Sequence, residues 1–166
     1  MGDDVFDFEA LLKEGEAALD QFPYDIASAH YESEDFPKDV AIEASFRHMV
    51  MYLGWAIERE LISDRFKINC ADMIMQFKKR QINPTDLFKM CCGNELSKEH
   101  FNDTGNDFTK MYYRPGWKHT YTNDYNIMTG WPDKHNYLED TWENLEKVNS
   151  MIDKRYKEWL EEQKQN

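Results

Sequence analysis

Two histidines and a carboxylate are the residues of this chain that come closest to a metal-binding set. His30 and His48 lie on either side of Glu43 in the sequence, and imidazole and carboxylate groups are ligands that zinc accepts. These three side chains could meet in the folded protein. The alternative is that His48, which lies among apolar residues, is a hydrogen-bonded histidine of the core. We favour the core histidine, because the sequence has no metal-binding spacing, and we predict neither a metal nor another cofactor.

Other motifs for catalysis are absent or incomplete in the sequence. Its glycines are isolated, so there is no phosphate-binding loop, and there is no nucleophile elbow. The segment Asn102–Asp107 has the composition of a calcium loop, but its glycine is misplaced and no glutamate closes it. We expect a polar helix segment there, with Gly105 allowing the close approach of another element. Cys91 and Cys92 are expected to pack in the core, and the protein is predicted not to be an enzyme.

The segment His30–Pro37 combines acidic and aromatic side chains, a composition suited to binding a basic surface. The rings would contribute buried area, and the carboxylates would steer a partner and pair with its arginines. The alternative is an acidic cap on the helix that is expected after Pro37. The predicted partner-binding residues are Tyr31, Glu32, Glu34, Asp35, Phe36 and Asp39.

The negative charge of the chain is concentrated near its N-terminus. The chain carries −12 at pH 7, and Met1–Ser45, with thirteen Asp or Glu and two Lys, accounts for −11. A field of one sign attracts partners of the opposite sign and repels like ones. It argues against binding nucleic acid or an anionic membrane, both of which need a basic surface, and it favours docking on a basic protein. A solubilising acidic end is the alternative.

Hydrophobic periodicity, caps and chain breaks predict a mainly α protein. The whole chain, 1–166, is expected to fold as one domain, an irregular bundle of about six helices. A short strand is considered within Tyr24–Pro37, and a short β-hairpin near residues 114–135. The aromatic residues of Arg114–Tyr137 either cover the core or form an exposed recognition surface. The predicted helices span residues 4–21, 39–60, 65–79, 83–93, 97–113 and 139–162, the first of them acidic.

Three sequence features favour a cytoplasmic location. The three cysteines are an odd number without zinc-type spacing, which is typical of reduced thiols. The acidic N-terminus lacks the basic start and apolar stretch of a signal peptide. No apolar run approaches the length that spans a bilayer.

A series of short motifs gives the chain a family resemblance. The motifs are His30-Tyr31, Asp35-Phe36-Pro37, His48 with Leu53-Gly54-Trp55, Asn83-Pro84, Leu87-Phe88, Asn102-Asp103, Gly105-Asn106 with Phe108, Tyr112-Tyr113, Thr141-Trp142-Glu143-Asn144, and Asp153 with Arg155-Tyr156. In order and spacing, across residues 24–159, the chain resembles an uncharacterised family of small bacterial cytosolic domains. The resemblance assigns no catalytic residue to this chain. It implies that members of the family look like the immunity genes that lie beside bacterial polymorphic toxins.

Two main hypotheses about function follow, beside a third, a housekeeping interaction module whose acidic end only keeps it soluble. The first is an immunity protein, an antitoxin that occludes the basic active-site surface of a cognate antibacterial toxin. Its acidic face would combine the first helix with the Glu32–Asp39 loop. The second is a protein, or an enzyme, that binds a small ligand or metal at a site around His30, Tyr31, His48 and Trp55. Capture of a protein through charge is expected for the first, and a bound metal or ligand for the second.

Overall fold

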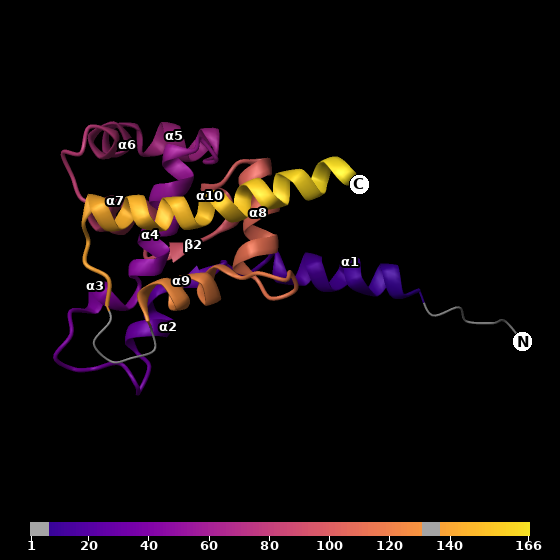
Figure 1. Ribbon diagram of the computed structural model, residues 1–166, viewed down its shortest axis with the longest axis horizontal. Helices are drawn as coiled ribbons and strands as arrows, with labels where there is room; N and C mark the ends of the chain where they lie inside the picture. The colour runs from indigo at the N-terminus through magenta and orange to yellow at the C-terminus, as the bar shows by residue number, and fades with distance from the viewer. Residues whose placement is uncertain (1–6, 131–136) are drawn as a thin grey trace, which may run out of the picture.

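The computed structural model describes residues 7–130 and 137–166, and within these ranges the chain is mainly helical (Figure 1). This confirms the predicted fold class. The first half forms α1 (Phe8–Leu19), β1 (Asp25–Ile26), α2 (Ala27–Tyr31), α3 (Ile42–Ser45), α4 (Arg47–Glu58), α5 (Asp64–Asn69) and α6 (Ala71–Lys78). The second half forms α7 (Pro84–Cys92), β2 (Glu95–Leu96), the short 3-10 helix η1 (Lys98–His100), α8 (Asp103–Tyr113), α9 (Tyr121–Thr129) and α10 (Trp142–Gln165).

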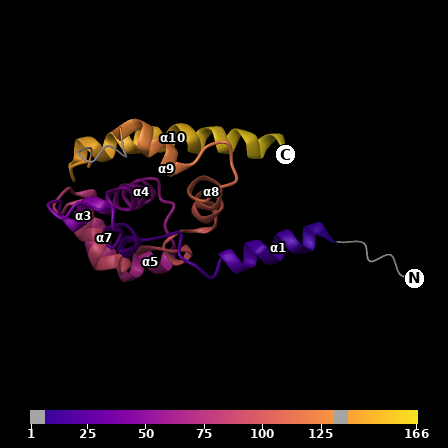
Figure 2. The ribbon, with the colours of Figure 1, turned by 90° about the horizontal axis from the view of Figure 1, so that it is seen from below.

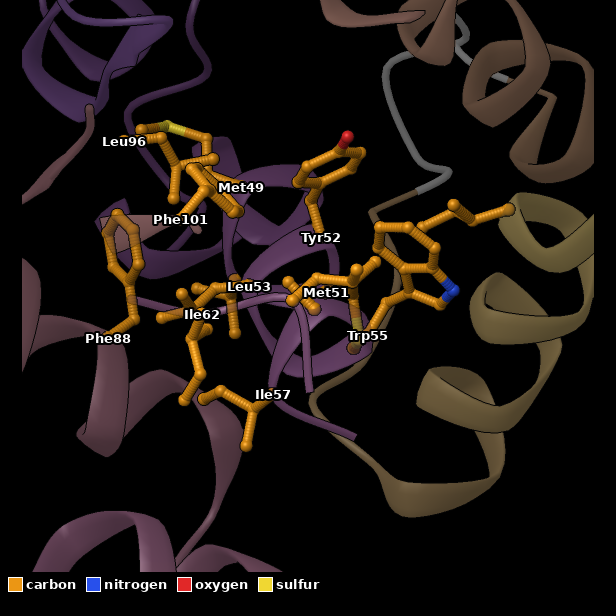
Figure 3. Close-up of a cluster of buried hydrophobic side chains, with 14 of the residues drawn as sticks. Met49, Met51, Tyr52, Leu53, Trp55, Ile57, Ile62, Phe88, Leu96 and Phe101 are labelled. Carbon is orange, nitrogen blue, oxygen red and sulfur yellow. The ribbon is translucent and has the colours of Figure 1, made fainter. Parts of the chain in front are cut away.

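Helix α4 is the centre of the fold. Every residue from Met49 to Ile57 is buried, as expected for a helix with apolar residues nearly all round. Helices α10 and α7 pack against it, and Figure 3 shows Leu53 and Trp55 of α4 directed to different sides of the helix. Within the described ranges, no helix combines the length and the apolar character needed to cross a membrane.

Three of the predicted long helices are interrupted. The helix predicted over 39–60 is divided into α3 and α4 at Phe46 (φ −113°, ψ 20°). The helix over 65–79 is divided into α5 and α6 at Cys70 (φ −118°, ψ 22°), and that over 97–113 into η1 and α8. The prediction of about six helices was therefore too low, since the described residues hold ten α-helices. Phe46 is only 2% exposed, so core packing outweighs local helix preference at this break.

Capping residues mark both ends of α7 and the start of α8. Asn83 accepts a hydrogen bond from a backbone N–H in the first turn of α7 (2.8 Å), and Pro84 begins that helix. The helix ends at Gly93, whose φ of 58° is left-handed. Asn102 caps α8 in the same way (2.8 Å), so the segment 102–107 is helical as predicted, although α8 begins later than the helix predicted from residue 97.

Two glycines allow helices to approach other parts of the chain closely. A β-carbon at Gly105 of α8 would overlap the backbone oxygen of Leu61, so the predicted close approach is confirmed. A β-carbon at Gly54 of α4 would lie 2.9 Å from a side-chain carbon of Leu145. This second glycine lets α10 lie close to the central helix.

The small sheet lies away from the segment where a hairpin was considered. Strands β1 and β2 pair antiparallel, with Asp25 opposite Leu96, so the strand considered within 24–37 is present. In the described part of residues 114–135 the structure has α9 instead, because Thr120 caps that helix and its aromatic face is buried. Tyr121 and Tyr125 lie in the core and Trp117 packs against it, whereas Tyr137 lines a pocket. Of the aromatic segment predicted over 114–137, residues 131–136 lie outside the described ranges.

Helix α1 extends away from the helical body, as Figures 1 and 2 show. Leu11, Leu12 and Leu19, which gave it a helical period, are 51–53% exposed. The loop that follows α2 lies toward the other end of the molecule. The predicted acidic face, which joined α1 to the Glu32–Asp39 loop, is therefore two separate surfaces. Hydrophobic periodicity places residues on one side of a helix but does not say what that side contacts.

The cysteines pack in or against the core, as predicted. Cys92 is buried, and Cys70 and Cys91 pack against the core from its edge. Burial raises the pKa of the Cys91 thiol to about 12, and the neighbouring Cys70 adds to this effect. A thiol with so high a pKa is a poor nucleophile at neutral pH.

Candidate functional site

A pocket of about 280 Å³ opens between α2, α3, the start of α4, α9 and the residues that precede α10. These elements lie on the side of the molecule away from α1 (Figure 1). The lining mixes apolar and polar side chains, and none of the described residues that line it is Lys or Arg. It consists of Asp25, Ala29, His30, Ser33, Asp35, Phe36, Ala44, Ser45, His48, Thr122, Tyr125, Asn126, Tyr137 and Leu138.

Asp25 lines this pocket and accepts four hydrogen bonds. The Nε2 atoms of His30 and His48 donate to its two carboxylate oxygens, at 2.7 Å and 2.9 Å respectively. The Tyr113 hydroxyl donates at 2.7 Å, and the backbone N–H of Ile26 donates at 2.9 Å. The Asp25 side chain is only 15% exposed, so these donors replace the water that it loses on folding.

The charges of this group follow from burial and hydrogen bonding. Burial raises the pKa of the Asp25 carboxyl, but the hydrogen bonds from His30 and His48 lower it by more, and the pKa lies well below its usual range. Burial lowers the pKa of His48, and the attraction of Asp25 only partly opposes this. An ionised carboxylate can only accept hydrogen bonds, so each imidazole is assigned its proton on Nε2.

Three structural features bring the side chains of Asp25, His30 and His48 together. Backbone hydrogen bonds join Tyr24 to Leu96 (2.6 Å) and Ala27 to Asn94 (2.9 Å), and these fix the strand that holds Asp25. Helix α2 starts directly after this strand, so one turn of helix returns His30 to Asp25. His48 lies in the first turn of α4, and its ring centroid is 4.5 Å from that of His30.

Two of the six predicted partner-binding residues line the pocket, and the other four do not. Asp35 and Phe36 are part of the lining, and the Phe36 ring lies 6.0 Å from the ring of Tyr137. Tyr31 is half-buried and packs against the core. Its role as an apolar anchor stays a prediction, as does that of Phe36, which is also half-buried.

The acidic loop, Glu32–Asp39, exposes its carboxylates to solvent. Asp39 does not cap a helix, because α3 begins after Ala41 and has no side-chain cap. None of the loop's carboxylates forms an ion pair within the described ranges, whereas Glu43 on α3 binds Lys89 at 2.9 Å. The four exposed carboxylates are Glu32, Glu34, Asp35 and Asp39.

The alternative site predicted from the sequence is assembled only in part. His30 and His48 meet at Asp25, but Trp55 is buried in the core and donates a hydrogen bond to Asp153 of α10 (2.8 Å). Glu43, the carboxylate considered as a metal ligand, points instead to Lys89. His48 is a hydrogen-bonded histidine, as predicted, and it also lines the pocket.

Asp25 and Tyr113 are the members of the site that sequence reasoning missed. Asp25 precedes His30 by little more than a helical turn, a spacing that a search for carboxylate and histidine pairs could have found. Tyr113 carries no such signal, because it lies far along the chain at the end of α8. Only the packing of α8 beside β1 places its hydroxyl on Asp25.

A family model described as a domain of unknown function, DUF7832, matches residues 23–139. The chain belongs to this family. The DUF7832 segment contains every residue that lines the pocket, from Asp25 to Leu138, while α1 and α10 lie outside it. The resemblance noted across 24–159 is thereby confirmed over most of its length, and its motifs in α10 fall beyond the matched residues. Neither a curated protein nor a solved structure matches the chain.

Proposed function

We propose that this DUF7832 protein captures a basic partner protein with the acidic loop and the adjoining pocket. In its specific form the proposal is an immunity protein, an antitoxin that occludes the basic active-site surface of a cognate antibacterial toxin in the cytoplasm. The observation that carries it is the exposure, without an ion pair in the described ranges, of Glu32, Glu34, Asp35 and Asp39.

Unpaired charge on the loop contrasts with the paired carboxylates of the helical body. Glu146 of α10, for example, lies 2.5 Å from Arg80. A paired carboxylate has less charge to offer a partner, because its field is largely cancelled at short range. The four loop carboxylates add their fields instead, which speeds the encounter with a basic surface and favours one orientation of docking.

The pocket beside the loop supplies a receptor for a basic side chain. Its lining includes Asp25 and Asp35, and no Lys or Arg is among the lining residues that the structure describes. Phe36 and Tyr137 contribute aromatic surface next to these carboxylates. A lysine or arginine suits such a pocket, since its stem is apolar and its end is charged. An inserted arginine is a common source of binding energy in protein interfaces.

The test is a pull-down, in which the tagged full chain captures its partner protein from the native host. One variant neutralises the acidic loop, with Glu32→Gln, Glu34→Gln, Asp35→Asn and Asp39→Asn. A control variant removes the same amount of charge from exposed positions elsewhere, with Glu9→Gln, Glu14→Gln, Glu16→Gln and Glu161→Gln. We expect the wild type to capture one toxin domain, the loop variant to bind it at least about 10-fold more weakly, and the control to bind it normally.

Salt provides a second readout of the same interface. Higher salt is expected to weaken capture by the wild type more than capture by the loop variant, because exposed charges are screened. Equal binding by all three proteins would contradict the loop as the interface. A captured partner without toxin activity would contradict the immunity function while leaving partner capture in place.

Ligand binding in the pocket is the second candidate function. It is favoured by the convergence of His30 and His48 on Asp25 next to an open cavity. A metal or small molecule that copurifies with the wild type and not with a His48→Gln variant would support it. Toxin capture that is unaffected by His48→Gln would assign the two functions to different residues.

A further inference from the structure

We infer that Asp25, His30 and His48 bind one transition-metal ion, and that zinc matches these ligands best. One ligand atom from each of the three side chains lies within 4.8 Å of the others. Among the residues that the structure describes, it is the one group of three His, Cys, Asp or Glu side chains with this property. This inference deepens the second candidate function, ligand binding in the pocket. Asp25, His30 and His48 also line the pocket of the proposed interface, but none of them belongs to the acidic loop.

The spacing of the ligand atoms is close to that of a metal site. Donor atoms about 2.1 Å from a tetrahedral zinc lie roughly 3.4 Å from one another. The two histidine nitrogens now lie 2.7 Å and 2.9 Å from the oxygens of Asp25. Small rotations of these side chains would therefore admit an ion. Each imidazole would then bind through Nε2 and carry its proton on Nδ1.

The surrounding structure holds the ligands in a fixed frame. Asp25 lies on a strand whose flanking backbone groups are hydrogen bonded, and His48 belongs to the buried central helix. The Tyr113 hydroxyl and the Ile26 N–H donate to the Asp25 carboxylate. Outer partners of this kind orient a ligating carboxylate and increase metal affinity.

The ligand types select among metals. Two imidazoles and one carboxylate suit zinc and its first-row neighbours, whereas magnesium and calcium prefer sites made entirely of oxygen. Three protein ligands leave at least one coordination position for water or a small ligand. The adjoining pocket has room for either, since its volume is about 280 Å³.

The competing interpretation is that the three side chains form only a structural hydrogen-bond group. Asp25 already accepts four hydrogen bonds within the fold, and such a group stabilises the fold without binding anything. The two interpretations differ in one measurable property, stoichiometric binding of a metal by the folded chain.

The experiment is calorimetric titration of the purified full chain, stripped with a chelator, with zinc, with cobalt and with magnesium. We expect one zinc or cobalt per chain, no binding of magnesium, and a rise in the melting temperature with zinc. His30→Gln and His48→Gln are each expected to weaken zinc binding by about 100-fold or more, since even outer-shell changes weaken it by up to that factor. Glutamine keeps a donor for Asp25, and circular dichroism checks the fold.

Two control variants make the result specific. His119→Gln changes a histidine outside the pocket, and Glu43→Gln changes a carboxylate that pairs with Lys89 instead of joining the group; both are expected to bind zinc normally. If His48→Gln fails to fold, His30→Gln decides, because His30 is 35% exposed. A folded wild type that binds no zinc, or zinc binding that survives both histidine changes, would overturn the inference. Loss of toxin capture in the acidic-loop variant, with zinc binding intact, would separate this site from the proposed interface.

Discussion

Asp25 is the residue on which the most contacts of the site depend. Its carboxylate joins β1 to α2, α4 and α8 through His30, His48 and Tyr113. Removing the acceptor leaves several buried donors without a partner, whereas removing one donor leaves the rest in place. Loss of a buried acceptor costs more than loss of a single hydrogen bond for this reason.

The first prediction compares two variants of this group in the metal-free protein. Asp25→Ala is expected to lower the free energy of unfolding by about 3 kcal/mol, because His48 and Tyr113 lose their acceptor in a buried setting. Tyr113→Phe keeps the ring and is expected to cost about 1 kcal/mol. Urea unfolding followed by circular dichroism measures both. Similar losses for the two variants would show that Asp25 is not the centre of the group.

At the scale of elements, Gly105 and Gly15 offer a matched pair of helical glycines. Gly105 of α8 faces the backbone oxygen of Leu61, and nothing lies within 4 Å of the position that a β-carbon would take at Gly15 of α1. The same substitution therefore has opposite physical consequences at the two positions.

The second prediction is that Gly105→Ala destabilises the protein by about 3 kcal/mol, because the backbone of Leu61 has to move. Gly15→Ala is expected to be neutral or to stabilise by up to about 1 kcal/mol, because alanine is a better helix former. Thermal unfolding of the two variants measures the contrast. A mild effect at Gly105 would mean that α8 can shift away from Leu61 without loss.

Helix α1 is joined to the body by few contacts. Asp20, just beyond its end, binds Lys110 at 2.9 Å and Arg114 at 3.2 Å, and Leu11, Leu12 and Leu19 remain half exposed. It also lies outside the DUF7832 segment. Elements with little buried apolar surface contribute little to global stability.

The third prediction is that deletion of residues 1–18 lowers the free energy of unfolding by less than about 1 kcal/mol. The deletion leaves both ion pairs of Asp20 and the whole pocket in place. Denaturant unfolding provides the measurement, and zinc binding and partner capture are expected to persist. A large loss of stability would indicate that α1 packs against the body in solution.

For the whole molecule, ion pairs connect α10 to the rest of the fold. Arg155 of α10 binds Asp124 of α9 at 2.7 Å, and Arg59, just after α4, binds Asp153 of α10 at 2.6 Å. Burial raises the pKa of both carboxyls, but hydrogen bonds from the arginines and from Tyr112 or Trp55, together with the arginine charges, outweigh it, and both pKa values lie below their ordinary value. These carboxyls are therefore more acidic in the folded than in the unfolded chain.

The fourth prediction follows from the lowered pKa of these two carboxyls in the folded chain. A carboxyl with a lowered folded pKa stabilises the protein above its unfolded pKa of about 4, and this stabilisation is lost as the pH falls through the folded value. We expect the free energy of unfolding to hold down to about pH 5 and to drop below about pH 4. Urea unfolding over this range tests it, with Asp124→Asn expected to reduce the drop. A flat profile in acid would contradict these ion pairs.

The sequence alone determined the features that depend on near neighbours in the chain. The helical class and the capped start of α7 at Asn83 were predictable, because periodicity and capping act over three or four residues. The start of α8 at Asn102 was not, since the predicted helix began at residue 97. The central position of α4 was predictable as well, since a helix that is apolar nearly all round must be covered. The acidic loop was also predictable, from the residue composition of Glu32–Asp39.

Tertiary structure decided how these pieces meet. The breaks at Phe46 and Cys70 depend on which side chains the core accepts, and the separation of α1 from the acidic loop depends on where the chain turns. The site itself depends on Asp25 meeting His48 and Tyr113 from distant parts of the sequence. A contact of this kind carries no local signal, because its energy arises only when separate elements pack together and exclude water.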